Sequence, residues 1–138
     1  MTRAALAQAL RARILDEARA AFPRECCGLL EGLRFEGAHG EEFRVTALHP
    51  ARNLAPESDR FEVAPEDHIQ ALKAARASGH GLIGCYHSHP NGRAEPSLAD
   101  KAGAGEENFL WLIAAGERLE AFVYRRGEFS GIGWTEPE

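Results

Sequence analysis

Two histidines and an aspartate near the middle of the chain have the types and the spacing of metal ligands. His87 and His89 stand two residues apart, and Asp100 follows eleven residues after His89. Because side chains alternate between the two faces of a β-strand, both histidines would point the same way from a strand. Two imidazoles and one carboxylate suit Zn²⁺, and three protein ligands leave a fourth position open for a reactive water. The pattern therefore predicts a catalytic zinc site.

Ser97 and Asp100 also have the spacing of a helix start. A serine followed three residues later by an acidic residue can form a capping box, in which the two residues satisfy backbone N–H groups of the first turn. The sequence therefore predicts a short helix over 97–104. The positive end of that helix would keep the Asp100 carboxylate ionised, so capping and metal binding are compatible roles.

The three cysteines offer other uses of the same region. Cys85 would share a strand face with the two histidines, which makes a Cys-His-His site conceivable, and Cys26 or Cys27 could serve as a thiol nucleophile. Neither use explains Ser97 and Asp100, so we expect the cysteines to be small buried hydrophobic residues. An odd number with two of them adjacent argues against a disulfide framework and favours a reduced, intracellular protein.

Two motifs together resemble a known family. The run His-Ser-His-Pro, with seven residues between His89 and Ser97 and then Ser-Leu-Ala-Asp, is similar to the signature of the JAMM (MPN-plus) metalloproteases, small prokaryotic branch. The segment Pro-Arg-Glu-Cys-Cys-Gly-Leu-Leu at 23–30 resembles the upstream motif of that family. The resemblance covers nearly the whole chain. It implies a single domain over 1–138, with an α+β fold in which helices flank a curved mixed sheet, similar to cytidine deaminases.

The resemblance also implies a role for each residue of the site. His87, His89 and Asp100 would bind one Zn²⁺ per chain. Glu25, which alone is only a charge after a helix, would act as general acid and base, because water must lose a proton and the leaving amine must gain one. Ser97 would hydrogen-bond the oxyanion of the tetrahedral intermediate. The expected activity is that of a zinc metallopeptidase.

The substrate expectation comes from the same family. Its members cleave peptide or isopeptide bonds after the C-terminal Gly-Gly of ubiquitin-like proteins, and the small prokaryotic branch implies a sulfur-carrier protein as partner. The short connection 90–96 leaves no room for an inserted loop that would hold a second ubiquitin. An extended Gly-Gly tail could pair with a sheet edge near the metal, and its lack of side chains would allow close approach.

Two other functions share parts of the pattern. A non-catalytic MPN-type scaffold would bind a ubiquitin-like partner, but loss of a ligand or of Glu25 would mark it, and neither is lost. A DNA-associated protein of the RadC group carries a very similar histidine motif. The net charge of −5 and the lack of a Lys/Arg cluster disfavour nucleic-acid binding.

Composition is that of an ordinary globular protein. The chain has 138 residues, of which 44% are apolar and 27% charged, and these values suit one domain with one core. No run approaches the ~18 apolar residues of a membrane span, and no signal-peptide pattern opens the chain. We therefore expect a cytoplasmic protein without a membrane partner. The oligomeric state stays open.

Helices and strands can be placed from periodicity. An apolar residue every fourth position from Leu6 to Phe22 predicts a helix over 3–22, ended by Pro23. Pro65 at its first position and Gly79 after its end predict a second helix over 65–78. Buried or alternating runs predict a strand after Glu25 and further strands over 41–49, 81–89, 108–114, 118–125 and 128–134, with a short extended piece at 61–63.

Overall fold

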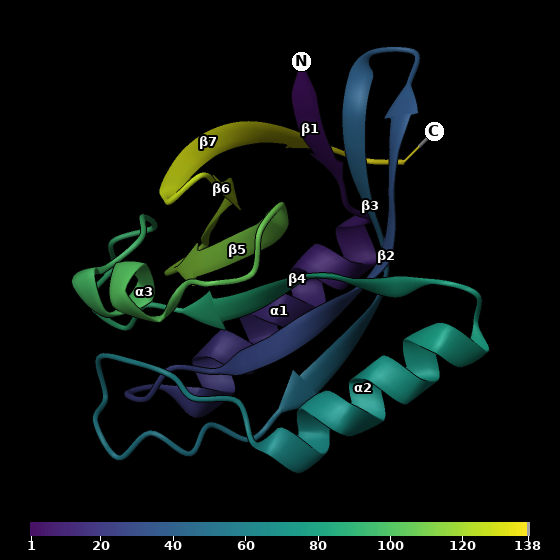
Figure 1. Ribbon diagram of the computed structural model, residues 1–138. Coiled ribbons are helices and arrows are strands. Elements are labelled where there is room, and N and C mark those ends of the chain that lie inside the picture. Colours follow the sequence, from purple (N-terminus) through teal and green to yellow (C-terminus); the bar gives the residue numbers. More distant parts are fainter. Residues whose placement is uncertain (138) are drawn as a thin grey trace.

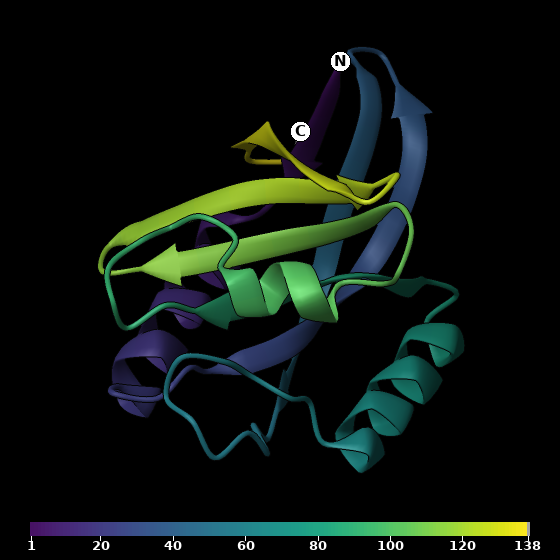
Figure 2. The same ribbon diagram turned by 60° about the vertical axis from the view of Figure 1, so that its left-hand side comes forward.

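Seven strands form a ring in which every strand has two neighbours. The computed structural model describes residues 1–137, and Figures 1 and 2 show the ring from two sides. The strand order is β1-β3-β2-β4-β5-β6-β7, and β1 also pairs with β7, which closes the ring. In chain order the elements are β1 Thr2–Ala5, α1 Gln8–Ala21, β2 Cys27–Gly37, β3 Gly40–Ala51, α2 Pro65–Ala77, β4 Gly81–Ser88, α3 Leu98–Gly103, β5 Phe109–Ala115, β6 Arg118–Arg125 and β7 Glu128–Thr135.

The sheet is mixed, as the sequence predicts. β1 runs parallel to β3 and β7, and β4 runs parallel to β5, while the remaining neighbours are antiparallel. The α+β class is thus confirmed. β4 lies between β2 and β5, so a substrate tail cannot pair with an edge of the strand that carries His87. Pairing of the tail with a sheet edge elsewhere near the site stays a prediction.

Alternation along the strands divides the interior into two clusters. Tyr86 and Leu112 face α1, whose Ile14 is fully buried against them in the larger cluster. Cys85 and Trp111 face the other way and pack with Ala71 of α2 in the smaller cluster. Burying an aliphatic side chain contributes about 1.5–3 kcal/mol, so the two helices fix the orientation of β4. Within residues 1–137 no helix is long and apolar enough to span a membrane.

The first helix starts later than predicted. Residues 2–5 form β1, and α1 begins only at Gln8. The prediction of a helix from residue 3 is wrong because these residues fill the gap between β3 and β7, where both sides of the backbone find partners. Ala4 and Ala5 are 0% and 1% exposed there. Weak local preference is overridden by this pairing.

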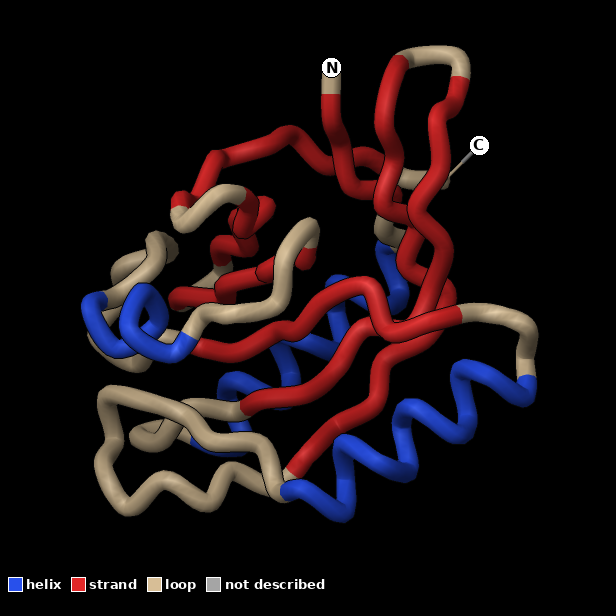
Figure 3. The backbone as a smooth tube through the Cα atoms, viewed as in Figure 1, coloured by secondary structure: helices blue, strands red, loops and turns tan. Residues whose placement is uncertain are grey.

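The remaining elements lie close to their predicted positions. β4 ends at Ser88, one residue before the predicted end, so His89 stands just beyond the strand. α2 ends at Ala77 and is followed by Gly79 with φ +78°, the left-handed conformation that ends many helices. Residues 61–63 contribute only an isolated bridge, between Asn53 and Val63. Figure 3 shows α3 and the loop after β3 at the end of the molecule where β4 ends.

Away from that end, a buried glutamate joins three elements. Both ladders of β2 shift register next to Glu31, and its carboxylate contacts His49 Nε2 at 2.8 Å and His80 Nδ1 at 2.7 Å. Burial alone would raise the pKa of Glu31, but the hydrogen bonds from His80 and His49 lower it. Each carboxylate oxygen has its own histidine donor, so the group is satisfied as a structural contact between β2, β3 and the start of β4.

We predict that Glu31→Gln lowers the free energy of unfolding at pH 7 by about 1–3 kcal/mol, because it removes hydrogen bonds to a charged acceptor. The pKa of Glu31 is lower in the folded protein than in the unfolded chain. Its contribution to stability is therefore complete above the unfolded pKa of ~4.3 and is lost as the pH falls through the folded pKa. Urea titrations at pH 7 and at lower pH measure both effects. Glu36→Gln, on the exposed part of β2, is the control. Equal stability of the two variants at pH 7 would contradict the prediction.

Candidate metal centre

The end of β4 brings the two predicted histidines together. His87, fully buried, and His89, 4% exposed, point to the same region, and their Nε2 atoms lie 3.0 Å apart. The two rings meet edge to face with centroids 4.7 Å apart. The predicted arrangement of the His-x-His pair is therefore present, although His89 lies just past the strand.

Asp100 reaches the same point from α3. Its Oδ2 atom lies 3.0 Å from His87 Nε2 and 3.1 Å from His89 Nε2. The predicted capping box is confirmed: Ser97 Oγ accepts from the Asp100 N–H, and Asp100 Oδ2 accepts from the Ser97 N–H, both at 3.0 Å. The box fixes the carboxylate rigidly against the two imidazoles.

The chemistry of these three atoms fits a bound cation. His89 Nδ1 lies 2.7 Å from the Arg93 carbonyl, so this nitrogen carries the proton and donates it. In the neutral ring Nε2 is then a lone-pair acceptor, and it faces the carboxylate oxygen of Asp100 at 3.1 Å. Two acceptors at this distance repel unless a positive charge lies between them. His87 Nε2, His89 Nε2 and Asp100 Oδ2 form a triangle with sides of 3.0–3.1 Å. These spacings suit an ion that lies ~2.0–2.2 Å from each atom, the distance of zinc contacts.

Electrostatics favour the ligand forms of two of these groups. Burial lowers the pKa of His87 and outweighs its hydrogen bond to Asp100, which keeps the imidazole neutral. Burial would raise the pKa of Asp100, but the adjacent imidazoles of His87 and His89 lower it strongly. Burial alone would lower the pKa of His89, but the Asp100 carboxylate and the Arg93 carbonyl outweigh burial and raise it. A neutral imidazole beside an ionised carboxylate is the combination that binds a divalent metal.

Glu25 completes the buried group. It is 3% exposed, and its Oε1 has no hydrogen-bond partner within residues 1–137. One ligand atom each from Glu25, His87 and His89 lies within 4.8 Å of the others, so this cluster could also hold a metal ion. Burial raises the pKa of Glu25 to about 7. Asp100 is closer to both histidines, which leaves Glu25 beside the triangle rather than in it.

Two aromatic residues enclose His87 on the side away from α1. Phe61 stacks on the imidazole with centroids 4.4 Å apart and planes at 28°, and Trp111 meets it edge-on at 5.6 Å. An apolar wall of this kind excludes water from a metal ligand. Sequence reasoning missed both residues, because Phe61 comes from the loop after β3 and no local motif marks it.

Ser88 faces the opposite way and holds the segment next to Glu25. The Cys26 N–H donates to Ser88 Oγ at 2.8 Å, and the Ser88 N–H donates to the Cys26 carbonyl at 3.2 Å. The residue between the two histidines therefore ties β4 to the chain that carries Glu25. Strand alternation predicts that Ser88 points away from the histidines, but the bond to Cys26 depends on the fold.

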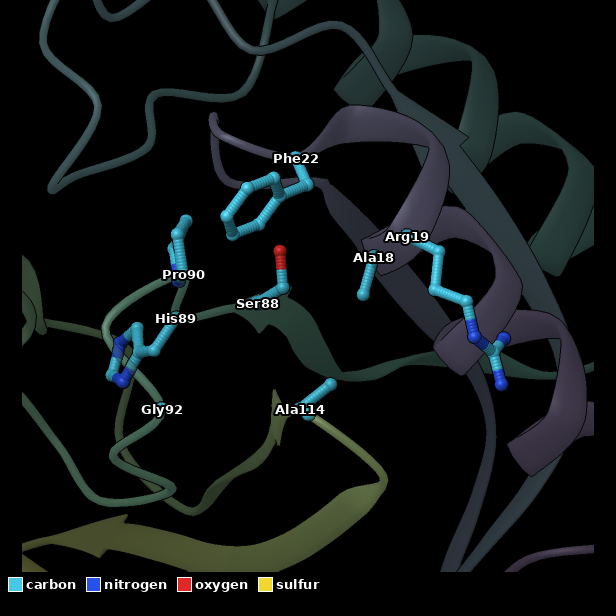
Figure 4. A pocket seen from close by; sticks show the side chains of 9 residues that line it. Ala18, Arg19, Phe22, Ser88, His89, Pro90, Gly92 and Ala114 are labelled. Carbon is cyan, nitrogen blue, oxygen red and sulfur yellow. The ribbon is translucent and has the colours of Figure 1, made fainter.

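A small cleft and a larger cavity open beside His89. The cleft, of about 140 Å³, is lined by Glu25, Ser58, Asp59, His89, Pro90, Asn91 and Ser97. The cavity, of about 340 Å³, shares His89 and Pro90 with it and continues to Phe22 at the end of α1. Figure 4 shows the Ser88 hydroxyl pointing into the cavity between Phe22 and Ala114. A chain lying over His89 would pass from the narrow space into the wider one.

Comparison with known proteins decides the family. A model of prokaryotic homologs of the JAB domain matches residues 7–126. The chain belongs to the prokaryotic JAB family. The resemblance to JAMM proteins seen in the sequence is thereby confirmed.

The JAB relatives include proteins named for the conjugates that they cleave. The chain is 33% identical to the desampylase of Haloferax volcanii, an alignment that covers 93% of this chain and 92% of that protein. It is 32% identical to a probable TtuB-protein conjugate cleaving protease of Thermus thermophilus, with 89% and 74% covered. The solution structure of a Desulfitobacterium hafniense protein, at 27% identity, superposes with a TM-score of 0.83 and covers 100% of this chain and 94% of that one.

The cysteines of this JAB protein take no place in the triangle. Cys85 packs with Leu29 and Trp111 in the smaller cluster, and burial raises its pKa well above the usual value. Burial likewise raises the pKa of Cys26 to about 11 and that of Cys27 to about 12. Thiols in this state are poor nucleophiles and poor ligands at neutral pH. All three behave as the buried small residues that the sequence predicts.

We predict that Asp100→Ala abolishes stoichiometric zinc binding, because it removes the oxygen that lies between both imidazoles. Glu25→Gln should retain one zinc per chain, because the carboxylate lies outside the triangle. Metal content after dialysis against excess zinc measures both, with circular dichroism to confirm folding. Full zinc occupancy in folded Asp100→Ala, with loss in Glu25→Gln, would assign the third ligand to Glu25.

Proposed function

We propose that this JAB protein is a zinc-dependent hydrolase that cleaves ubiquitin-like proteins from their conjugates, after the C-terminal Gly-Gly. The observation that carries the proposal is the three-atom group of His87, His89 and Asp100 with Glu25 beside it. The names of the two relatives support conjugate cleavage. We further propose that residues 1–138 act as one catalytic domain.

In this proposal the three residues of the triangle hold the ion, and each other group handles a proton or an oxygen. Zinc in this position supplies Lewis-acid activation of a water and of the scissile carbonyl. Glu25 accepts the proton of the attacking water on its carboxylate and delivers it to the departing nitrogen. Its pKa near 7, raised by burial, suits a group that must both take and give a proton at neutral pH.

In the same proposal Ser97 serves the oxyanion while it caps α3. Its Oγ accepts the Asp100 N–H with one lone pair, and a hydroxyl has a hydrogen left to donate. The residue borders the cleft together with Glu25 and His89. A carbonyl in the cleft would therefore have the serine donor within reach, an interaction worth ~2.7–4 kcal/mol in comparable sites.

The dimensions of the cleft support a glycine-rich tail. At about 140 Å³ it is less than half the volume of the adjoining cavity, and residues without side chains can approach its walls most closely. The adjoining cavity, bordered by Phe22 and Pro90, can hold a larger apolar side chain next to the glycines. We propose a ubiquitin-like sulfur carrier as the partner that presents such a tail.

We predict that Glu25→Gln lowers kcat by about 10²–10⁴-fold while zinc content and melting temperature stay near the parental values. The amide keeps the shape of the carboxyl but cannot carry the proton. Steady-state hydrolysis of a conjugate measures the change, and Glu95→Gln, an exposed glutamate in the 90–96 connection, is the matched control. A Glu25→Gln enzyme with near-parental kcat would move the proton role to another group.

The substrate is tested with a purified sulfur carrier that bears one extra residue or a lysine side chain on its Gly-Gly end. Mass spectrometry should find cleavage directly after the second glycine, loss of cleavage after chelation, and recovery on addition of zinc. A carrier whose tail ends in Ala-Ala should react at least tenfold more slowly. Equal cleavage of both tails, or of unrelated unfolded peptides, would contradict the proposed specificity.

A further inference from the structure

The carboxylate of Glu25 is not fully hydrogen-bonded within the described residues. Within residues 1–137 its Oε1 is buried without a partner, and the group is nevertheless held next to His89. With no hydrogen bond to hold Oε1, the position of the carboxylate depends on the backbone at residue 25 as well as on the packing around the side chain. Groups that fix this backbone help to control where the carboxylate lies. Loss of contacts that orient the residues of a metal site commonly lowers metal affinity or activity by about 10–100-fold.

The side chain of Asn53, in the segment after β3, hydrogen-bonds the Glu25 backbone. Asn53 Nδ2 donates to the Glu25 carbonyl at 3.0 Å and to the Arg60 carbonyl at 3.3 Å. Asn53 Oδ1 accepts from the Ala55 N–H at 2.9 Å and from the Glu62 N–H at 3.0 Å. The two carbonyl acceptors identify the nitrogen of the amide, and the two N–H donors identify its oxygen. The side chain thus makes two bonds through Nδ2 and two through Oδ1, which is its full capacity.

The oxygen of Asn53 closes the loop over the metal centre. Residues 54–62, which we call the covering loop, start and end at this atom, and the Leu54 N–H donates to the Glu62 carbonyl at 2.8 Å across the same point. The covering loop carries Phe61, which stacks on His87 at 4.4 Å. Arg24, next to Glu25, donates to the carbonyl of Ala55 in the same loop.

We propose that Asn53 is the positioning residue of this site, joining the backbone of the general base to the loop that covers a metal ligand. The inference rests on the proposed function. The amide is the side chain that fits, because it offers two donors for carbonyls and one oxygen for two N–H groups. Aspartate would keep the oxygen and lose the donors. Asn53→Asp therefore keeps the two N–H contacts that close the loop and loses the bonds to the carbonyls of Glu25 and Arg60.

A matched control comes from the base of the same loop. Asp67 accepts from the Arg52 N–H at 2.8 Å and from Arg52 Nε at 3.1 Å, directly before Asn53 in the chain. Asp67→Asn weakens this anchor without touching Glu25. If the activity depended only on how firmly the loop is attached, Asp67→Asn and Asn53→Asp would have similar effects.

The test compares parent, Asn53→Asp, Asn53→Ala and Asp67→Asn, each loaded with zinc. Both Asn53 variants should keep one zinc per chain and lose about 10–100-fold in kcat, with KM for a Gly-Gly conjugate changed less than threefold. Asp67→Asn should stay within about threefold of the parent in both constants. Parental kcat in folded Asn53→Asp, or an equal loss in Asp67→Asn, would overturn the proposal.

Hydrogen exchange provides a readout that does not need activity. In Asn53→Asp the amides of residues 24–27 should exchange at least tenfold faster than in the parent and in Asp67→Asn, because the hold on the Glu25 carbonyl is lost. Unchanged exchange there would overturn the proposal even if the variant is less active. If the parent cleaves no conjugate but exchange rises as expected, the positioning role stands and the proposed function fails.

Discussion

One carboxylate oxygen of Asp100 lies at hydrogen-bonding distance from two imidazole nitrogens that also lie 3.0 Å from each other. Buried polar atoms this close need a positive charge or a shared proton among them. The Arg93 carbonyl accepts a hydrogen bond from His89 Nδ1, so the inner nitrogen of the neutral ring is an acceptor. A cation at this point would satisfy all three atoms, and much of the surrounding structure keeps them together.

The two faces of β4 make different contacts that hold the residues of the site in place. On one face His87 is covered by Phe61 and Trp111, which belong to the covering loop and to β5. On the other face Ser88 ties the strand to Cys26, next to Glu25. Because a strand alternates faces, His87 and the anchor of the segment that carries Glu25 can be neighbours in sequence without competing for space. β2 and β5 pair with both sides of β4 and prevent it from shifting.

Features of the site that are local in sequence could be predicted from it. The His-x-His pair and the capping box at Ser97 need only a strand and a helix start, and both form where expected. The position of Glu25 beside them was predicted from motif resemblance, since it lies 62 positions before His87 in the chain. β1 was missed because its alanines have little strand preference and form a strand only by pairing with β3 and β7. Asn53 and Phe61 were missed for a related reason.

Both of those residues act through contacts across the fold. The partners of Asn53 include a carbonyl 28 positions earlier in the chain, and Phe61 meets a ring on another strand. Neither spacing repeats a known local pattern, and an asparagine between two turns is usually only a turn residue. Local motifs in the sequence can therefore indicate candidate catalytic residues, but the long-range contacts that organise them into a site depend on the fold.

The most direct test of the metal centre is the position of the ion itself. Crystals grown with zinc should give one anomalous peak per chain at the zinc edge, about 2.0–2.2 Å from His87 Nε2, His89 Nε2 and Asp100 Oδ2. The carboxylate of Glu25 should lie outside this distance. A peak coordinated by Glu25 in place of Asp100, or no peak at these residues with zinc bound elsewhere, would contradict the account.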